Sequence, residues 1–83
     1  MAKLLKSTGE VIQNVDVSTL KKMQDLVQGY IEFVYVGNTI LVVNEEGLLN
    51  NLPQNQQASN ISQRPLVGDV IVCSFAEIKL NQL

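Results

Sequence analysis

The sequence predicts a small α+β domain, in which one helix packs on a mainly antiparallel sheet. Two apolar runs between Gly29 and Pro53 are joined by Gly37-Asn38, and a Gly/Asn pair between β-rich runs is a strong hairpin signal. Before this hairpin, apolar residues recur at helical spacing between positions 20 and 27. With 83 residues the chain is one domain, residues 1–83 with a core at about 19–75, near the small end of what folds alone. We therefore expect a homo-oligomer.

The first elements precede the hairpin. The runs Lys3–Lys6 and Val11–Val15 flank a turn-like S-T-G-E cluster, which predicts a short strand or hairpin that enters the domain. A helix is then expected over Thr19–Gln28, because Ser18-Thr19 offers an N-cap and Gly29 suits the C′ position.

The hairpin arms differ in pattern. In the first arm, residues 30–36, both faces carry apolar groups, so we expect a central strand or one covered on both sides. Glu32 is the exception on its face, and it is either a solvent-facing or rim residue paired with a lysine, or an acceptor directed at a ligand. The second arm, Thr39–Val43, is a continuous apolar and β-branched run that ends at Asn44.

Residues 45–63 are strongly polar, but leucines at 48, 49 and 52, Ala58 and Ile61 would anchor them to a core. We expect an ordered loop with one short helical turn near Leu48–Leu52. After a turn at residues 66–69, Val70–Phe75 reads as a final buried strand. The tail Ala76–Leu83 suits a last strand or a helical turn equally.

Composition excludes several functions. A net charge of −2 argues against duplex nucleic acid, whose recognition needs a basic face. The chain has no histidine and one cysteine, so a four-ligand zinc site and the Ser/His and Cys/His nucleophile pairs are ruled out. The adjacent carboxylates Glu45 and Glu46 favour a solvated turn over an acid/base pair, since neighbours on an extended chain point to opposite faces. We expect no enzyme activity, no metal and no cofactor.

The surroundings of Cys73 indicate the compartment. This lone cysteine lies in the apolar run Val70–Cys73, which is typical of a buried thiol in a reducing cytosol. No apolar stretch approaches the roughly 18 residues that a membrane span requires, and the N-terminal residues are too short for a signal peptide.

The motifs GYIE at residue 29, NEEG at residue 44, LPQN at residue 52 and GD at residue 68 stand in register. In these motifs the chain resembles a family of small uncharacterised proteins found in phages and mobile elements. The match covers residues 19–73 and implies a viral or mobile-element origin. In design, though not in sequence, the chain also resembles viral sponges that bind a host immune signalling nucleotide without cleaving it.

The second resemblance implies non-catalytic sequestration of a cyclic nucleotide or a related signal in the host cytoplasm. Polar residues after the NEEG turn would contact base or ribose, Arg64 or loop N–H groups would take phosphate, and Tyr30 or Tyr35 would stack. The alternative is an interaction module that binds and inhibits a host protein. The expected ligand-binding residues are Tyr35, Asn44, Glu45, Asn55, Ala58, Ser59, Asn60 and Arg64.

Overall fold

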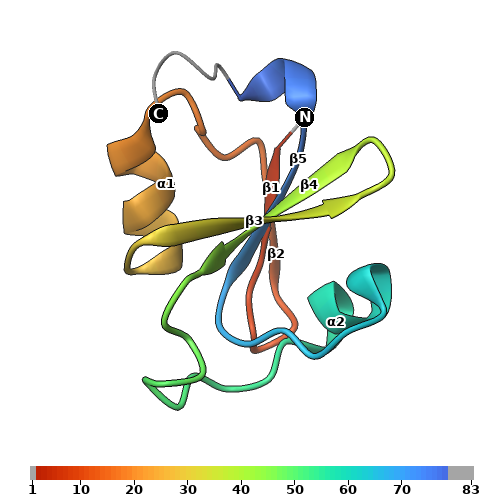
Figure 1. The fold of residues 1–83 in the computed structure, drawn as a ribbon. Helices are drawn as coiled ribbons and strands as arrows, with labels where there is room; N and C mark the ends of the chain where they lie inside the picture. Colours follow the sequence, from red (N-terminus) through yellow and green to blue (C-terminus); the bar gives the residue numbers. More distant parts are fainter. Residues whose placement is uncertain (1, 79–83) are drawn as a thin grey trace.

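A computed structural model describes residues 2–78, which form a five-stranded antiparallel sheet with a helix on each face (Figure 1). In chain order the elements are β1 (Lys3–Leu5), β2 (Val11–Gln13), α1 (Leu20–Val27), β3 (Ile31–Val36), β4 (Thr39–Asn44), α2 (Gln56–Ser62), β5 (Val70–Ser74) and the 3-10 turn η1 (Phe75–Glu77). The strand order is β2-β1-β5-β4-β3, and every neighbouring pair is antiparallel. The α+β class is confirmed, whereas the expectation of a single helix was wrong.

The N-terminal hairpin and α1 form where the sequence predicts them. Thr19 caps α1, since its side chain accepts a hydrogen bond from the Lys22 N–H at 3.2 Å. At the other end the left-handed residue is Gln28, with φ 65°, one position before the expected Gly29. Glycine at position 29 therefore needs another explanation, which lies in its close approach to β4.

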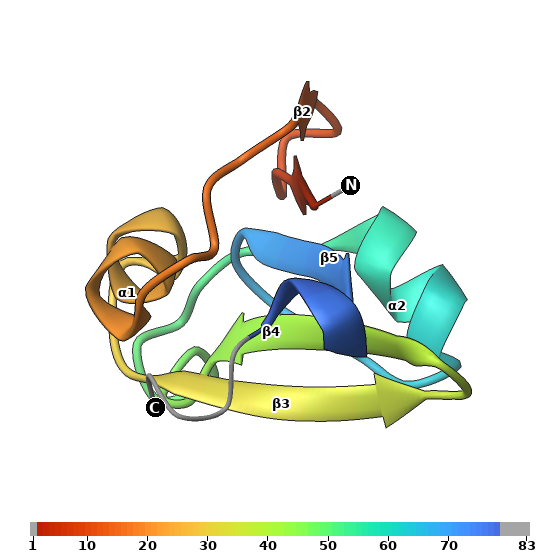
Figure 2. The same ribbon diagram turned by 90° about the horizontal axis from the view of Figure 1, so that it is seen from above.

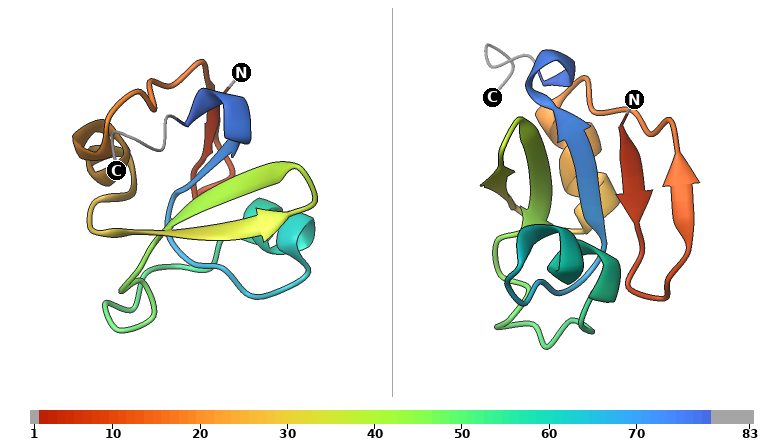
Figure 3. Two further views of the ribbon diagram at one scale, coloured as in Figure 1. Left: turned by 45° about the horizontal axis from the view of Figure 1, so that its top comes forward. Right: turned by 90° about the vertical axis from the view of Figure 1, so that its right-hand side faces the viewer.

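β3 and β4 form the expected hairpin. Val36 pairs with Thr39 across the two-residue turn, and Gly37 takes a φ of +58°, which suits a type II′ turn. Of the two positions expected for β3, the central one was wrong, because β3 is an edge strand and β4 separates it from β5 (Figure 3). The alternative, a strand covered on both sides, agrees with its packing, since Phe33 packs against the core beneath α1 and Val34 lies in the core beneath α2.

α2 occupies the segment that the sequence predicted as a loop. Asn55 caps it, with a side chain that accepts from the Ala58 N–H at 3.1 Å. Ala58 is the one buried residue of this helix, so its sequence carries no apolar stripe to reveal it. Residues 45–51 form successive turns, and the Asn50 N–H bonds to the Glu46 carbonyl at 3.0 Å near the expected helical turn.

Each face of the sheet has its own core. α1 covers one face and α2 the other, as the right-hand view of Figure 3 and the view in Figure 2 show. Because β4 and β5 lie inside the sheet, their side chains alternate between the two cores, and residues 40–43 of β4 and 70–73 of β5 are all apolar. The core beneath α2 contains Leu5, Val34, Leu41, Val43, Ala58, Leu66 and Val70.

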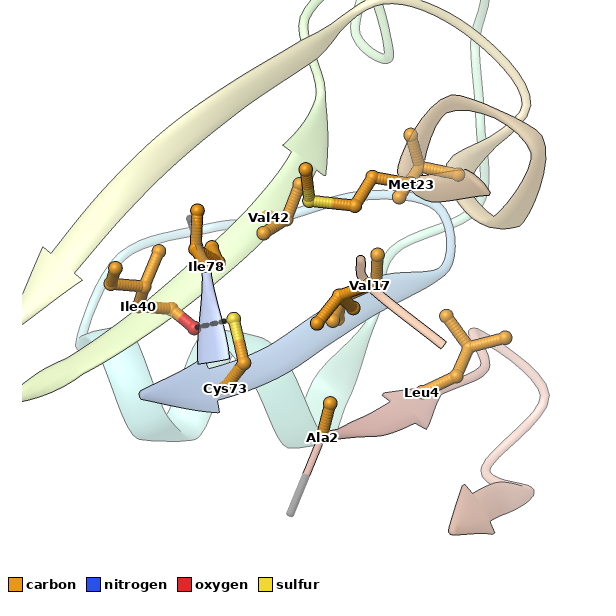
Figure 4. Packing of buried hydrophobic residues seen from close by; sticks show 10 residues of the cluster. Ala2, Leu4, Val17, Met23, Ile40, Val42, Cys73 and Ile78 are labelled. Carbon is orange, nitrogen blue, oxygen red and sulfur yellow. Dashed lines mark hydrogen bonds between the residues drawn. The ribbon is translucent and has the colours of Figure 1, made fainter. Parts of the chain in front are cut away.

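The core beneath α1 surrounds Cys73 (Figure 4). The Cys73 thiol is buried against Ile40, whose carbonyl lies 3.8 Å from Sγ, and burial raises the pKa of the thiol to about 11. Ile78, just after η1, is buried in the same cluster, while Leu80 and Leu83 lie outside the described residues. Nothing in residues 2–78 forms a helix long and apolar enough to cross a membrane.

Candidate functional site

Asn44 joins the end of β4 to the end of α1. Its amide nitrogen donates to the carbonyls of Val27 at 3.1 Å and Gln28 at 3.3 Å, and its oxygen accepts from the Glu46 N–H at 2.8 Å. The residue is 7% exposed. A Cβ on Gly29 would lie 2.7 Å from the same amide nitrogen, which explains the glycine. The predicted ligand residue Asn44 thus satisfies the free carbonyls of a helix end.

An open groove of about 520 Å³ lies beside Asn44, between the last turn of α1 and the turns that follow β4. Asp25 and Glu46 bring two carboxylates to it, the last turn of α1 holds no basic residue, and the described lining residues include no lysine or arginine. Tyr30 is 65% exposed at its rim. The groove is lined by Gln24, Asp25, Gln28, Gly29, Tyr30, Asn44, Glu46 and Asn50.

A smaller hollow of about 120 Å³ lies on the α2 side of the sheet. It brings together three expected site residues, Asn44, Glu45 and Arg64, and adds Glu32. Glu32 and Arg64 are exposed, and no ion pair joins the Arg64 guanidinium to any carboxylate within residues 2–78. Of the two roles weighed for Glu32, the structure shows a solvent-facing rim residue without a lysine partner among the described residues.

Asn55 is fully buried and supports the fold around α2. Its amide nitrogen donates to the carbonyls of Leu5 at 2.7 Å and Gly68 at 2.8 Å, while its oxygen caps α2. Ala58 is also 0% exposed. Neither residue presents a surface to a ligand in this structure. Asn55 instead caps α2 and bonds buried carbonyls, and Ala58 packs in the core beneath α2.

The remaining expected residues are dispersed. Ser59 Oγ lies within hydrogen-bonding distance of the Leu66 backbone, 2.9 Å from its N–H and 3.2 Å from its carbonyl. Asn60 is exposed on α2 and accepts from Gln56 at 2.9 Å. Tyr35 lies on the face of the sheet that α2 does not cover, on the same side of β3 as Phe33. The eight expected residues therefore do not converge on one site.

Tyr35 belongs to an exposed aromatic cluster that the sequence did not reveal. Its ring stacks on Phe75, with centroids 5.7 Å apart and planes at 10°, and Phe33 meets it edge to face at 6.2 Å. Tyr35 is 61% and Phe75 50% exposed. Phe75 was expected as the last residue of a buried strand, but β5 ends at Ser74 and the chain turns into η1.

The cluster lies beside the free edge of β3, the edge that pairs with no other strand within residues 2–78. The Glu45 N–H bonds to the Tyr30 carbonyl at 2.8 Å, and Val36 and Thr39 close the two-residue turn, so even-numbered residues direct their backbone groups toward β4. The N–H and C=O groups of Ile31, Phe33 and Tyr35 consequently face away from the sheet. Their outward direction depends on strand order, which the sequence pattern does not contain.

No group of three or more metal-binding side chains occurs within residues 2–78. A search of curated proteins found no match, and a search of solved structures found none either. A family model does match residues 1–81, almost the entire chain, and its description is a domain of unknown function. The chain therefore belongs to the DUF3846 family.

Proposed function

We propose that this domain is a non-catalytic binding module that takes an extended segment of another protein along β3. The observation that carries the proposal is the free edge, where the backbone groups of Ile31, Phe33 and Tyr35 face outward. An extended segment that adds to such an edge gains main-chain hydrogen bonds, and side-chain contacts provide its specificity. β3 spans six residues, enough for three outward-facing positions.

Side-chain contacts are available at the C-terminal end of β3. The Tyr35–Phe75 stack leaves large parts of both rings exposed, and an apolar side chain on the incoming strand would cover them. Exposed aromatic rings are enriched where proteins bind one another. The stack therefore supports a partner strand that carries an apolar residue beside Tyr35.

The motif resemblance to phage and mobile-element proteins leads us to propose a host protein in the host cytoplasm as the partner. Binding would act by occupying the partner's strand, so the module needs no chemical step. A free edge is also an aggregation hazard that proteins normally block, and a bound partner would remove that hazard.

The test is a proline at Tyr35, where the N–H faces the free edge. Proline is tolerated at such positions, because no hydrogen bond within the sheet is lost. Tyr35→Ala is the matched control, since it removes the same ring and keeps the N–H. A peptide library is selected on the unmodified domain, and each enriched peptide is then measured on both variants.

We expect Tyr35→Ala to weaken binding moderately and Tyr35→Pro to abolish it, with unfolding curves that show both variants folded. Peptide binding should also protect the Phe33 and Tyr35 amides from hydrogen exchange. Equal affinities for the two variants would refute strand addition at β3.

The groove beside Asn44 favours a second candidate, a small ring-containing ligand. Its volume of about 520 Å³ falls in the usual range for ligand sites. Tyr30 offers a ring for stacking, and Gln24 and Gln28 offer amides. A nucleoside fits these groups better than its phosphates do, since Asp25 and Glu46 line the groove.

Arg64, the expected phosphate contact, lines the hollow on the other side of the sheet. A cyclic nucleotide in the groove would thus point its phosphates to solvent. Thermal shift with nucleosides and cyclic dinucleotides tests this candidate, and recovery of the ligand intact after heating separates binding from turnover. Loss of a shift in Tyr30→Ala would place the ligand in the groove, and the absence of any shift across the panel would eliminate the candidate.

A further inference from the structure

Four carboxylates surround the start of β3. Asp25 and Glu46 line the groove beside Tyr30, and Glu32 and Glu45 line the hollow on the other face. In the hollow Arg64 lies near the carboxylates, but the described lining of the groove contains no cation. The free edge of β3 therefore runs from an acidic end at Tyr30 to an aromatic end at Tyr35.

The end of α1 increases the negative potential of the groove. Cations stabilise a helix C-terminus, yet the last turn of α1 has no basic residue and contains Asp25. Asp25 pairs with Lys21 at 2.7 Å, but both side chains are well exposed, so this ion pair is weak. The exposed ring of Tyr30 lies at the same groove and can accept a cation on its face.

The geometry points to a basic extended segment as the partner, with a lysine or arginine side chain in the Tyr30 groove and an apolar side chain on the Tyr35–Phe75 stack. This inference rests on the proposed addition of a strand to β3, and it names the chemistry of that strand. The groove and Tyr35 lie on the same face of the sheet, and side chains on one face of a strand recur at every second residue. The basic and apolar residues of the partner are therefore separated by an even number of positions, about four or six, close to the spacing of Tyr30 and Tyr35. Charge complementarity at one end then sets the direction in which the partner binds.

The probes are two acetylated and amidated seven-residue peptides, KTVTVTV and VTVTVTK, which place the lysine at either end of a β-forming segment. Each has a twin with glutamate in place of lysine. Affinities are measured by isothermal titration calorimetry on the full chain and on three variants. Glu46→Gln removes a groove carboxylate, Glu10→Gln removes an exposed carboxylate next to β2 at the far edge, and Tyr35→Pro blocks the β3 edge.

We expect one lysine peptide to bind about tenfold more tightly than its glutamate twin at low salt. Glu46→Gln should reduce this preference to about threefold, Glu10→Gln should leave it unchanged, and higher salt should diminish it. Tyr35→Pro should abolish binding of both twins.

Equal binding of lysine and glutamate twins, still abolished by Tyr35→Pro, would overturn the basic partner while leaving strand addition intact. If no peptide binds the unmodified chain, strand addition fails together with this inference. In a last control, spermidine is added at the concentration of the peptide. If the preference for lysine over glutamate then disappears, the groove binds a free small cation, and the assignment to a partner side chain is overturned.

Discussion

Substitution of Asn55 should reduce stability sharply, although the sequence suggests a ligand contact. Asn55→Ala removes the donor to two buried carbonyls, at about 1 kcal/mol each, and the cap of α2, at about 1 kcal/mol. The expected loss in the free energy of unfolding is therefore about 3 kcal/mol. Asn55→Ser keeps a capping oxygen and should lose about 2 kcal/mol. A domain of this size has only about 4 to 12 kcal/mol of stability, so either loss is large.

Urea denaturation followed by circular dichroism measures these losses. Asn60→Ala is the matched control, because Asn60 lies on the same helix and its side chain makes only an exposed hydrogen bond, with Gln56. We expect that control to change stability by less than about 0.5 kcal/mol. Stability of Asn55→Ala within about 1 kcal/mol of the unmodified domain would refute the role assigned to the buried amide.

Three further predictions concern steric fit, charge and reactivity. Gly29→Ala should lower the free energy of unfolding by about 1 to 3 kcal/mol, since the new Cβ meets the Asn44 amide. The loss should be smaller in an Asn44→Ala background, and a double-mutant cycle by thermal unfolding measures the difference. The Lys22 ammonium donates to the Asp16 carboxylate at 2.7 Å and holds the pKa of Asp16 well below its usual range. Ionised Asp16 therefore stabilises the fold at pH values above its ordinary pKa, and this stabilisation is lost as the pH falls through the lowered pKa. In Lys22→Met, an NMR titration should show a raised Asp16 pKa. The Cys73 thiol, with a pKa of about 11, should react with a disulfide reagent at pH 8 only as fast as the domain opens, and a reaction as fast as that of unfolded chain would contradict its burial.

The sequence was sufficient for elements whose cause is local. The β3–β4 turn needs a positive φ, which Gly37 supplies, and Thr19 caps a helix whose apolar residues have the correct period. Strand order has no such local cause. β1 lies next to β5, with Leu4 opposite Ile71, so the sheet is completed by residues at the two ends of the chain. This pairing leaves β3 at the edge, although apolar groups on both its faces suggested a central strand or one covered on both sides.

α2 shows the same limit for a helix. Its sequence, QQASNIS, has neither an apolar stripe nor strong helix formers throughout. Tertiary bonds from Asn55 to Leu5 and Gly68 position its first turn, and these partners lie 50 and 13 residues away. Context of this kind overrides weak propensity, so a polar segment that reads as a loop becomes a helix.

The residues expected to form the site are dispersed for a related physical reason. Amides in a polar segment after a strand are as well suited to satisfying buried backbone carbonyls as to binding a ligand, and only burial separates the two uses. Asn44 and Asn55 are buried and their amides bond to backbone carbonyls, whereas Tyr35 remains available at the surface. The binding surface that we propose is instead the backbone of β3, whose N–H and C=O groups are common to nearly every residue type. A functional surface made from such groups leaves no motif, and its side-chain signal is confined to the rings and carboxylates at its two ends.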